Sequence, residues 1–370
     1  MGVVGLVANP ASARDIRRLV ADGSAVTTHD KLNIVRRVLA GLGSVGVERV
    51  LSMQDGGGIS AGLASMVDRP SADTWPEVAF VNHPVTQTAV DTVSAVTSMV
   101  RAGVGAIVVI GGDGTNRKVL SACGDTPLMP LSTGTNNAFP QPAEASVAGI
   151  AAGLVALGRV RPVDAGTPAR WLTVQHGARV HHAVVDVAVT RADGTGAGAV
   201  TDAAEVCELY LCLAEPHSIG LSAIGAHLRP VGRDDADGLI VRLGQPAVAR
   251  VRAPIAPGRL VDVDVAAVQT LHANQPIRVT ATAGVLAIDG ERIFRFGPAD
   301  VPMVTLHGNG PVVIDVARTM RHAACSGLLS LPPRRSPDRA DRTCPQPPPT
   351  QPARGPAVAL QASVPQEPTH

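Results

Sequence analysis

The sequence predicts an α/β fold, in which an N-terminal doubly wound parallel-sheet domain precedes a C-terminal antiparallel β-sandwich-like domain. In the first half, short apolar runs alternate with segments whose apolar residues recur at helical spacing. The run Ala106 to Ile110 is apolar throughout, which is typical of a strand covered on both faces of a parallel sheet. In the second half, stretches such as Arg259 to Val268 alternate apolar and polar residues, as half-exposed strands do.

Each apolar run of the first half is expected to be a strand, and each periodic segment a helix. The segment 30–43 places Leu32, Val35, Leu39 and Leu42 on one helical face and ends in glycine, as helices commonly do. Strands alternating with such helices are the pattern of a doubly wound sheet. The predicted strands are Val3–Val7, Val47–Leu51, Val78–Val81 and Ala106–Ile110, and the predicted helices cover 14–20, 30–43, 90–103, 116–124 and 144–158.

The change of pattern divides the chain into predicted domains. Residues 1–163 form the α/β domain, and residues 164–310, which include the strand-rich stretch 277–297, form the β-rich domain. Residues 311–331 contain a last strand that is expected to pair back with the first domain. Residues 332–370 are rich in proline, which breaks helices and strand ladders, so they are expected to be a disordered tail. The tail contains PxxP motifs, so binding of a partner protein is an alternative to a tail without a function.

Composition and charge exclude several classes of function. The formal net charge of +1 argues against an extended surface for nucleic acid or for acidic membranes. Aromatic residues make up only 2% of the chain, so platforms for stacking single-stranded bases are not expected. The five scattered cysteines contain no CxxC pair, and the sequence starts without a signal-peptide pattern. The expectation is a cytoplasmic protein whose partners are small molecules, with no nucleic acid and no membrane.

A turn of glycines follows the run Ala106–Ile110 and carries a single carboxylate. In a doubly wound sheet, ligands bind beyond the carboxyl ends of the strands, where Gly111, Gly112, Asp113 and Gly114 are expected to lie. Glycines let main-chain N–H groups approach a ligand, and the start of the following helix favours phosphate. Asp113 would repel an anion there unless it acts as a base or shares a metal ion. A purely structural role as a turn or cap residue stays open.

A second polar turn follows the next apolar run, in the sequence PLMPLSTGTNNAFP (127–140). Small hydroxyl and amide side chains there can hydrogen-bond to ribose or phosphate, and Gly134 gives access to the main chain. Because both turns follow neighbouring strands, we expect them to form one cleft.

Other features predict less. The stretch 56–61, GGGISA, fits a degenerate dinucleotide-binding pattern but is interpreted as a flexible loop, and no Walker A lysine loop occurs. His181 and His182 are neighbours on a predicted strand and therefore point to opposite faces, which argues against a shared metal site. Arg117, just after the glycine turn, is a candidate phosphate contact.

The motifs GGDGTNR (111–117) and STGTNNAFP (132–140) resemble those of the ATP-NAD/AcoX kinase family, within the superfamily of NAD kinases and diacylglycerol kinases. The opening VANPAS, the stretch 214–230 and AIDGER (287–292) are similar to further motifs of the AcoX branch, so the resemblance covers most of residues 1–318. It implies an NAD kinase-like fold, an activity that uses ATP and Mg²⁺, and a homo-oligomer.

The resemblance also implies roles for single residues. Asp113 would be the catalytic carboxylate, which orients or deprotonates the acceptor hydroxyl. Asp289 and Glu291 match a motif that returns carboxylates toward the active site and would hold magnesium. The residues that match nucleotide- or phosphate-binding positions are Asn9, Gly111, Gly112, Gly114, Thr115, Asn116, Gly134, Thr135, Asn136, Asn137 and Asp186.

The sequence departs from the NAD kinase pattern at two places. Where NAD kinases carry an Asn-Glu pair that grips a ribose, this chain has Val185 and Asp186. The strand-like stretch DGLIV (237–241) is followed by RLGQPAV in place of the expected Ser/Thr/Gly-rich segment. Both departures argue against NAD as the phosphate acceptor, although NAD stays a candidate substrate.

Three functions are therefore weighed. The first is an ATP- and Mg²⁺-dependent kinase that phosphorylates a hydroxyl of a small molecule, with conversion of NAD to NADP as one case. The second is a lipid kinase of the diacylglycerol kinase type, against which the near-neutral charge and the lack of a basic amphipathic helix argue. The third is a non-catalytic nucleotide-sensing protein, since binding and turnover use the same residues.

Overall fold

The computed structural model describes residues 2–10, 26–67, 75–133, 137–191, 199–200 and 202–330. The predicted helix over 14–20 and the proline-rich tail over 332–370 lie outside these ranges. The chain from Met1 to Leu329 forms one compact unit. The domain limits expected at residues 163 and 310 stay predictions.

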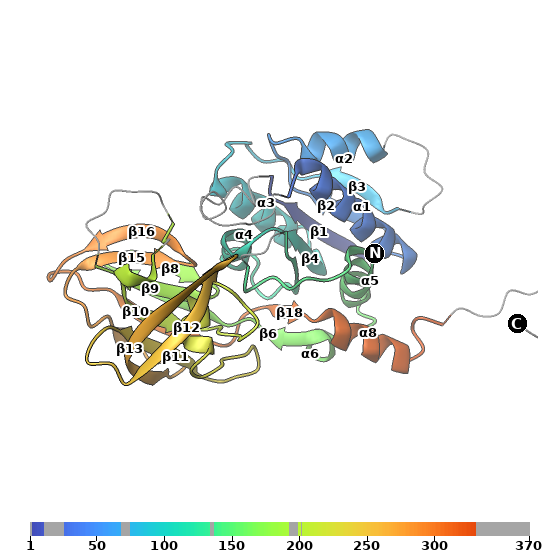
Figure 1. Ribbon diagram of the computed structural model, residues 1–370. Coiled ribbons are helices and arrows are strands. Elements are labelled where there is room, and N and C mark those ends of the chain that lie inside the picture. Colours follow the sequence, from blue (N-terminus) through green and yellow to red (C-terminus); the bar gives the residue numbers. More distant parts are fainter. Residues whose placement is uncertain are drawn as a thin grey trace, which may run out of the picture. The chain divides into compact units, whose positions relative to one another are not determined.

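A parallel sheet organises the first half of the chain (Figure 1). Five strands follow the order β3-β2-β1-β4-β5, and all neighbouring pairs among them are parallel. A strand from near the end of the chain, β18, extends the sheet parallel to β5, and β6 closes it as an antiparallel edge. The predicted doubly wound sheet is confirmed. Its strands are β1 (Val3–Ala8), β2 (Arg49–Ser52), β3 (Glu77–Phe80), β4 (Ala106–Ile110), β5 (Leu128–Leu131), β6 (Gly166–Pro168) and β18 (Val312–Ile314).

Helices bury both faces of this sheet, as the apolar run of β4 predicts. Ala106, Val108 and Ile110 pack with one set of helices, while Ile107 and Val109 pack with the other set. A capping box, in which Thr27 and Asp30 bond each other's main chain and side chain, starts the longest helix, α1. The first set is α1 (Thr28–Ser44), α2 (Ile59–Val67) and α5 (Ala145–Ala156), and the second is α3 (Ala89–Arg101) and α4 (Asp113–Leu120).

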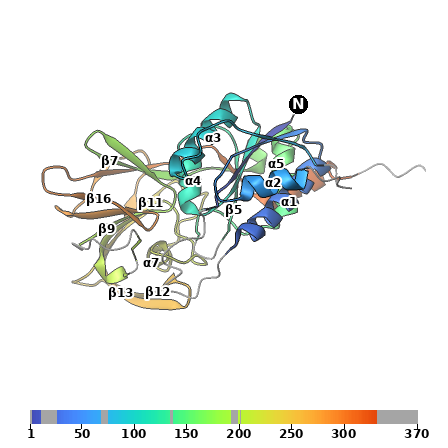
Figure 2. The same ribbon diagram turned by 90° about the horizontal axis from the view of Figure 1, so that it is seen from above.

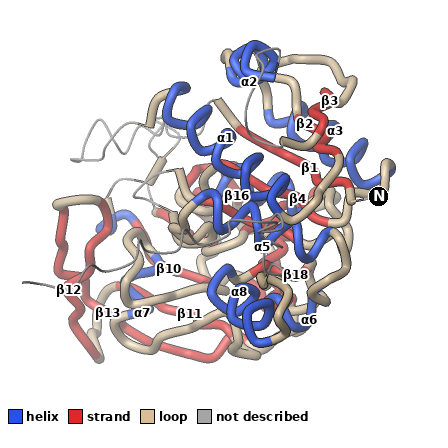
Figure 3. The backbone as a smooth tube through the Cα atoms, turned by 90° about the vertical axis from the view of Figure 1, so that its right-hand side faces the viewer, coloured by secondary structure: helices blue, strands red, loops and turns tan. Residues whose placement is uncertain are grey.

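Helices α4, α2 and α8 (Val316–Cys325) are among those that differ from the sequence prediction. Helix α4 begins at Asp113, three residues before the predicted start. Helix α2 begins at Ile59, inside the stretch 56–61 that the sequence predicts to be a flexible loop, because the Asp55 carboxylate accepts the N–H groups of Ile59 and Ser60. Helix α8 follows β18, is capped by Asp315, and lies beside the short helix α6 (Pro162–Ala165) (Figure 3).

Two antiparallel sheets form the rest of the compact unit. One sheet has the order β12-β13-β11-β10-β9-β15-β16, and the other has the order β14-β17-β7-β8. Leu172, Val189 and Tyr210 belong to the apolar core between them. The short helix α7 (Ser222–Ala226) packs against β12 (Figure 2). The strands are β7 (Trp171–His176), β8 (Arg179–Ala183), β9 (Asp186–Thr190), β10 (Val206–Leu211), β11 (Gly238–Leu243), β12 (Ala249–Ala256), β13 (Arg259–Leu271), β14 (Ile277–Arg278), β15 (Gly284–Ile288), β16 (Glu291–Phe296) and β17 (Met303–His307).

These sheets confirm the predicted antiparallel class of the second half. A 3-10 turn (Ala203–Glu205) precedes β10. Within the ranges that the structure describes, no helix combines the length and the apolar character needed to cross a membrane.

Acid is expected to destabilise the fold through His181, which stacks on Phe294 with ring centroids 5.1 Å apart. Burial lowers the pKa of His181 below its usual value of 6.5, and the neighbouring His176 and Lys118 add to this. At a pH between the pKa of His181 in the folded protein and its pKa in the unfolded chain, the unfolded chain binds the proton more readily. The stabilising contribution is therefore present above pH 6.5 and is lost as the pH falls through the folded-state pKa. Urea unfolding from about pH 7.5 down to about pH 5.5 should show this loss, and His181→Phe should reduce it. An identical pH dependence in the variant would contradict this assignment.

Candidate active site

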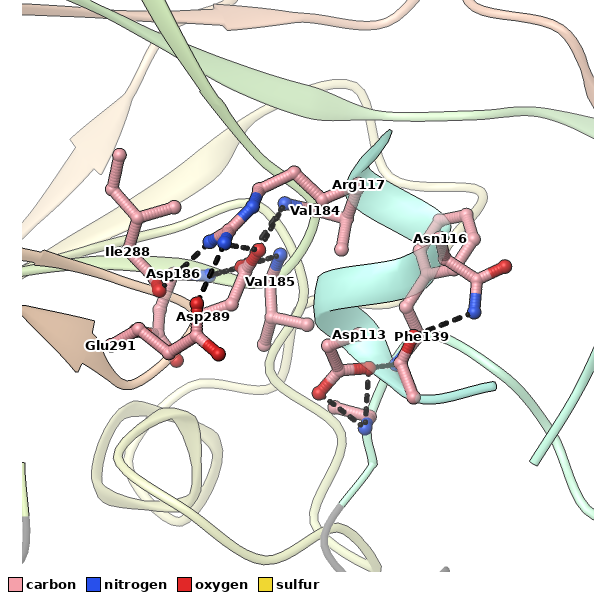
Figure 4. A network of polar contacts seen from close by, with 12 residues as sticks. Asp113, Asn116, Arg117, Phe139, Val184, Val185, Asp186, Ile288, Asp289 and Glu291 are labelled. Atoms are coloured by element: carbon pink, nitrogen blue, oxygen red, sulfur yellow. Dashed lines mark hydrogen bonds and ion pairs between the residues drawn. The ribbon is translucent and has the colours of Figure 1, made fainter. Parts of the chain in front are cut away.

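Asp113 lies at the carboxyl edge of the parallel sheet, as the sequence predicts. Strand β4 ends at Ile110, two glycines follow, and Asp113 is the first residue of α4. Its half-buried carboxylate accepts the N–H of Phe139 at 2.9 Å and the N–H of Ala138 at 3.2 Å to each oxygen (Figure 4). The turn after β5 thus fixes the orientation of this carboxylate.

The two polar turns touch each other, as the prediction of a common cleft requires. A Cβ atom on Gly112 would lie 2.7 Å from Oδ1 of Asn137, and one on Gly111 would lie 2.7 Å from Cβ of Thr115. Glycine at these two positions allows the close approach without displacement of a side chain. Gly112 is also the N-cap of α4 and supplies no side-chain hydrogen bond to the first turn. The N–H groups of such a helix start attract anions.

Gly112→Ala is expected to destabilise the protein by about 0.5–1.5 kcal/mol, because the new methyl group must displace the end of the Asn137 side chain and because alanine is a poorer N-cap residue than glycine. Gly114→Ala is the matched control on the same turn. The nearest atom to its Cβ would be Oε1 of Glu291 at 3.8 Å, and alanine favours a helix by up to about 1 kcal/mol over glycine. Chemical denaturation of both variants measures the difference. Equal stability changes in the two variants would show that the two turns are not packed as described.

The loop after β1 is joined to the same site. Nδ2 of Asn9 donates to Oγ1 of Thr115 at 2.9 Å. Nζ of Lys31, which is 1% exposed, donates to the carbonyl oxygens of Asn9 at 3.0 Å and Pro10 at 2.8 Å. The sequence reasoning did not identify Lys31. Its spacing of four residues before Val35 places it on the buried face of α1, and that spacing was an available signal.

Arg117 anchors the other side of α4 to the β15–β16 hairpin, and its role as a phosphate contact stays a prediction. Its Nη1 donates to the carbonyl oxygen of Ile288 at 3.0 Å and lies 3.4 Å from Oδ2 of Asp289. Its Nη2 lies 2.8 Å from Oε2 of Glu291. The side chain is only 8% exposed and points toward the β15–β16 hairpin (Figure 4).

Asp289 occupies the two-residue turn of this hairpin. Asp289 and Gly290 have φ angles of 48° and 79°, the left-handed geometry that an Asp-Gly turn favours. The carboxylate accepts N–H groups from Val184, Val185 and Asp186 at 2.9–3.3 Å. Burial raises the pKa of Asp289, while Arg117 and these N–H donors oppose that rise.

Magnesium fits Glu291 better than it fits Asp289. Both oxygens of Asp289 are engaged by main-chain donors, and Arg117 adds a positive charge beside them. The side chain of Glu291 is 55% exposed, and its Oε1 lies near Gly114 in the first turn of α4. No group of three or more His, Cys, Asp or Glu residues within the described ranges could hold a metal ion. Mg²⁺ commonly takes one or two carboxylates together with substrate phosphates, and Glu291 can supply one of them.

Three further residues that were predicted to contact a nucleotide, Asn116, Asn137 and Asp186, make contacts within the protein. Asn116 is fully buried, and its Nδ2 donates to the carbonyl oxygen of Gly112 at 3.0 Å, so it stabilises the start of α4. Asn137 donates to Oγ of Ser132 at 3.0 Å. Asp186 is 5% exposed and lies beside Asp289 at the start of β9 (Figure 4). Gly134, Thr135 and Asn136 lie outside the described residues.

Arg233 is a site neighbour that the sequence reasoning missed. It donates to the carbonyl oxygens of Ala138 and Phe139, whose N–H groups bind Asp113 on the other side. Its guanidinium carbon lies 5.2 Å from the centre of the Phe139 ring. The sequence around it, GRDDADG, is typical of an exposed loop and gave no signal of this contact.

Comparisons with known proteins match two separate parts of the chain to two family models. Residues 4–160 match the family model of the ATP-NAD kinase N-terminal domain, and residues 170–309 match that of the acetoin catabolism protein X C-terminal domain. Acetoin catabolism protein X of Cupriavidus necator is 43% identical over 340 residues, which cover 89% of this chain and 95% of that protein. Among solved structures, yeast NADH kinase complexed with NADH matches 90% of each chain with 14% identity and a TM-score of 0.46.

Proposed function

We propose that this chain, which belongs to the acetoin catabolism protein X family and has an NAD kinase-like α/β fold, is an ATP-dependent kinase. It transfers the terminal phosphate of ATP to a hydroxyl group of a small molecule. The observation that supports this most is the position of Asp113. A carboxylate at the start of α4, oriented by two N–H groups and next to a glycine turn, suits a general base beside bound phosphates.

The proposed reaction forms one bond and breaks one bond. The acceptor oxygen attacks the terminal phosphorus, the bond from that phosphorus to the bridging oxygen breaks, and ADP leaves. Asp113 accepts the hydroxyl proton as the attack proceeds. The glycine turn and the first N–H groups of α4 hold the phosphates, and the turn is fixed through Asn9 and Thr115. Magnesium, when bound near Glu291, supplies positive charge to the phosphates.

NAD is one candidate acceptor, and other hydroxylated compounds are the broader class. The matching N-terminal model supports ATP-dependent chemistry of the NAD kinase kind. The region that would select the acceptor matches a different model, that of acetoin catabolism protein X. Val185 stands where NAD kinases are expected to carry an amide, and Asp186 is buried. These features favour an acceptor other than NAD.

The test is ADP formation by purified protein with ATP and Mg²⁺, measured separately with NAD, with NADH and with a panel of hydroxylated metabolites. The proposal predicts acceptor-dependent ADP formation with at least one compound. Nucleotide binding without ADP formation for any compound would favour the sensing alternative.

A further inference from the structure

A small cavity lies next to the Asp113 turn and is lined by two arginines. Arg170 and Arg233 contribute to its wall together with Phe139, Val184, Cys212 and Leu213. Its volume is about 10 Å³, which is close to the room that one water molecule needs. Nη1 of Arg170 donates to the carbonyl oxygen of Gly232 at 2.7 Å, so the two arginines are held beside each other.

Both arginines carry buried donors for which the described part of the chain offers no acceptor. In Arg170, which is 6% exposed, these are Nε and Nη2, and in Arg233 the unpartnered atom is Nε. Neither guanidinium forms an ion pair with a carboxylate in the described ranges, although Asp113 and Glu215 attract Arg233 from a distance. The cavity thus has three buried N–H donor atoms and two positive charges on its wall.

Such an arrangement is costly in the absence of an anion. An unsatisfied buried donor lowers the stability of the fold, and the penalty is larger when the donor is charged. Burial lowers the pKa of both Arg170 and Arg233, which reflects the same penalty on the charged form. A carboxylate or a phosphate would satisfy these donors, because the planar guanidinium fork matches two oxygens of either group.

We propose that Arg170 and Arg233 form a subsite for an oxyanion, a carboxylate or phosphate group carried by the acceptor molecule. This inference rests on the proposed function and narrows its acceptor to anionic hydroxyl compounds. The segment Ala138–Phe139 joins the two sites, since Asp113 binds its N–H groups and Arg233 binds its carbonyl oxygens. An oxyanion held at Arg233 therefore lies near the proposed base. Because the cavity holds only about one water, the Arg233 side chain must move from the Phe139 ring when the anion enters.

The first experiment measures anion binding and needs no turnover. Thermal unfolding of the full chain is followed with inorganic phosphate, with acetate and with chloride at equal ionic strength. The variant Arg170→Met removes the two unpartnered donors of Arg170 and replaces the guanidinium-bearing side chain with an unbranched apolar one. Arg229→Met is the matched control, since Arg229 is exposed and lies between α7 and β11, in the same connection as Arg233. Phosphate or acetate should raise the unfolding midpoint of the wild type and the control by about 3 °C or more, and this rise should be lost in Arg170→Met.

The two probes also distinguish the source of the anion. A rise with phosphate alone indicates a phosphate ester as acceptor, and a rise with acetate indicates a hydroxy acid. If the anions do not raise the unfolding midpoint of the wild type, or raise that of Arg170→Met equally, the proposed subsite is wrong and the cavity binds only water.

The second experiment separates the subsite from the proposed function. Acceptor panels of hydroxy acids, hydroxylated phosphate esters and uncharged polyols are tested for ATP-dependent turnover. Arg170→Met should raise the KM of the anionic acceptor about 10–100-fold with a smaller effect on kcat. Turnover of uncharged polyols alone, unchanged in the variant, would overturn the subsite and keep the kinase. Anion binding that depends on Arg170, without turnover of any acceptor, would keep the subsite and overturn the kinase.

Discussion

Asp113→Asn is expected to lower the rate of phosphate transfer by roughly a hundredfold or more, while nucleotide affinity changes little. Asparagine has the shape of aspartate, and its side-chain oxygen can accept the N–H groups of Ala138 and Phe139 that Oδ1 of Asp113 accepts. The turn should therefore keep its geometry. The amide cannot accept a proton from the acceptor, so only the proposed base function is removed. Steady-state turnover and calorimetric nucleotide binding measure the two effects separately.

Asp125→Asn is the matched control for this variant. Asp125 is exposed beyond the end of α4, so the substitution removes the same charge at a distance from the turn. Turnover should stay within about twofold of the wild type. Equal turnover in Asp113→Asn and in the control would remove Asp113 from its proposed role.

Arg117→Met is expected to destabilise the protein by about 3–5 kcal/mol, because it leaves the buried Asp289 carboxylate without its cation. The side chains of this pair are 8% and 1% exposed, so solvent cannot replace the lost partner. Helix α4 also loses its attachment to the β15–β16 hairpin, and turnover should fall because Asp113 lies on the same helix. Urea denaturation measures the first effect.

Two further variants test the origin of this loss. Arg49→Met removes an exposed pair with Glu77, whose side chains are 49% and 66% exposed, and should cost less than about 1 kcal/mol. The double variant Arg117→Met/Asp289→Asn should lose less stability than the two single variants lose together. The reason is that the double variant no longer contains a buried carboxylate without a cation. Strict additivity would show that the two side chains do not interact.

Local patterns were sufficient for much of the fold. The apolar run at β4 and the periodicity of α1 predicted a parallel sheet with helices on both faces, and the structure confirms it. Helix α2 was missed because three glycines precede it, although Asp55 is a capping residue and Ile59 and Leu63 have helical spacing. Helix α8 was missed because its apolar residues are interrupted by Arg318, Arg321 and His322, and the cap residue Asp315 was the one available signal of its start.

Less of the candidate site could be predicted from short stretches of sequence. The glycine turn after β4 predicted the edge position of Asp113 correctly, since it depends on neighbouring residues alone. The Asp289-Gly290 pair is a hairpin-turn signal, yet it was interpreted as a metal motif. Arg170 and Arg233 bind main-chain oxygens that are 62 and 94 residues away in the sequence. Such pairings depend on how the sheets pack, which no local pattern encodes.

Transfer of the labelled terminal phosphate of ATP into a pool of hydroxylated metabolites, read by mass spectrometry, tests the central claim most directly. The account predicts that a compound with a free hydroxyl, and with a carboxylate or phosphate elsewhere, gains the label with the wild type and fails to gain it with Asp113→Asn. Label that stays in ATP or appears only as inorganic phosphate with the wild type, or labelled product formed equally by both proteins, would contradict it.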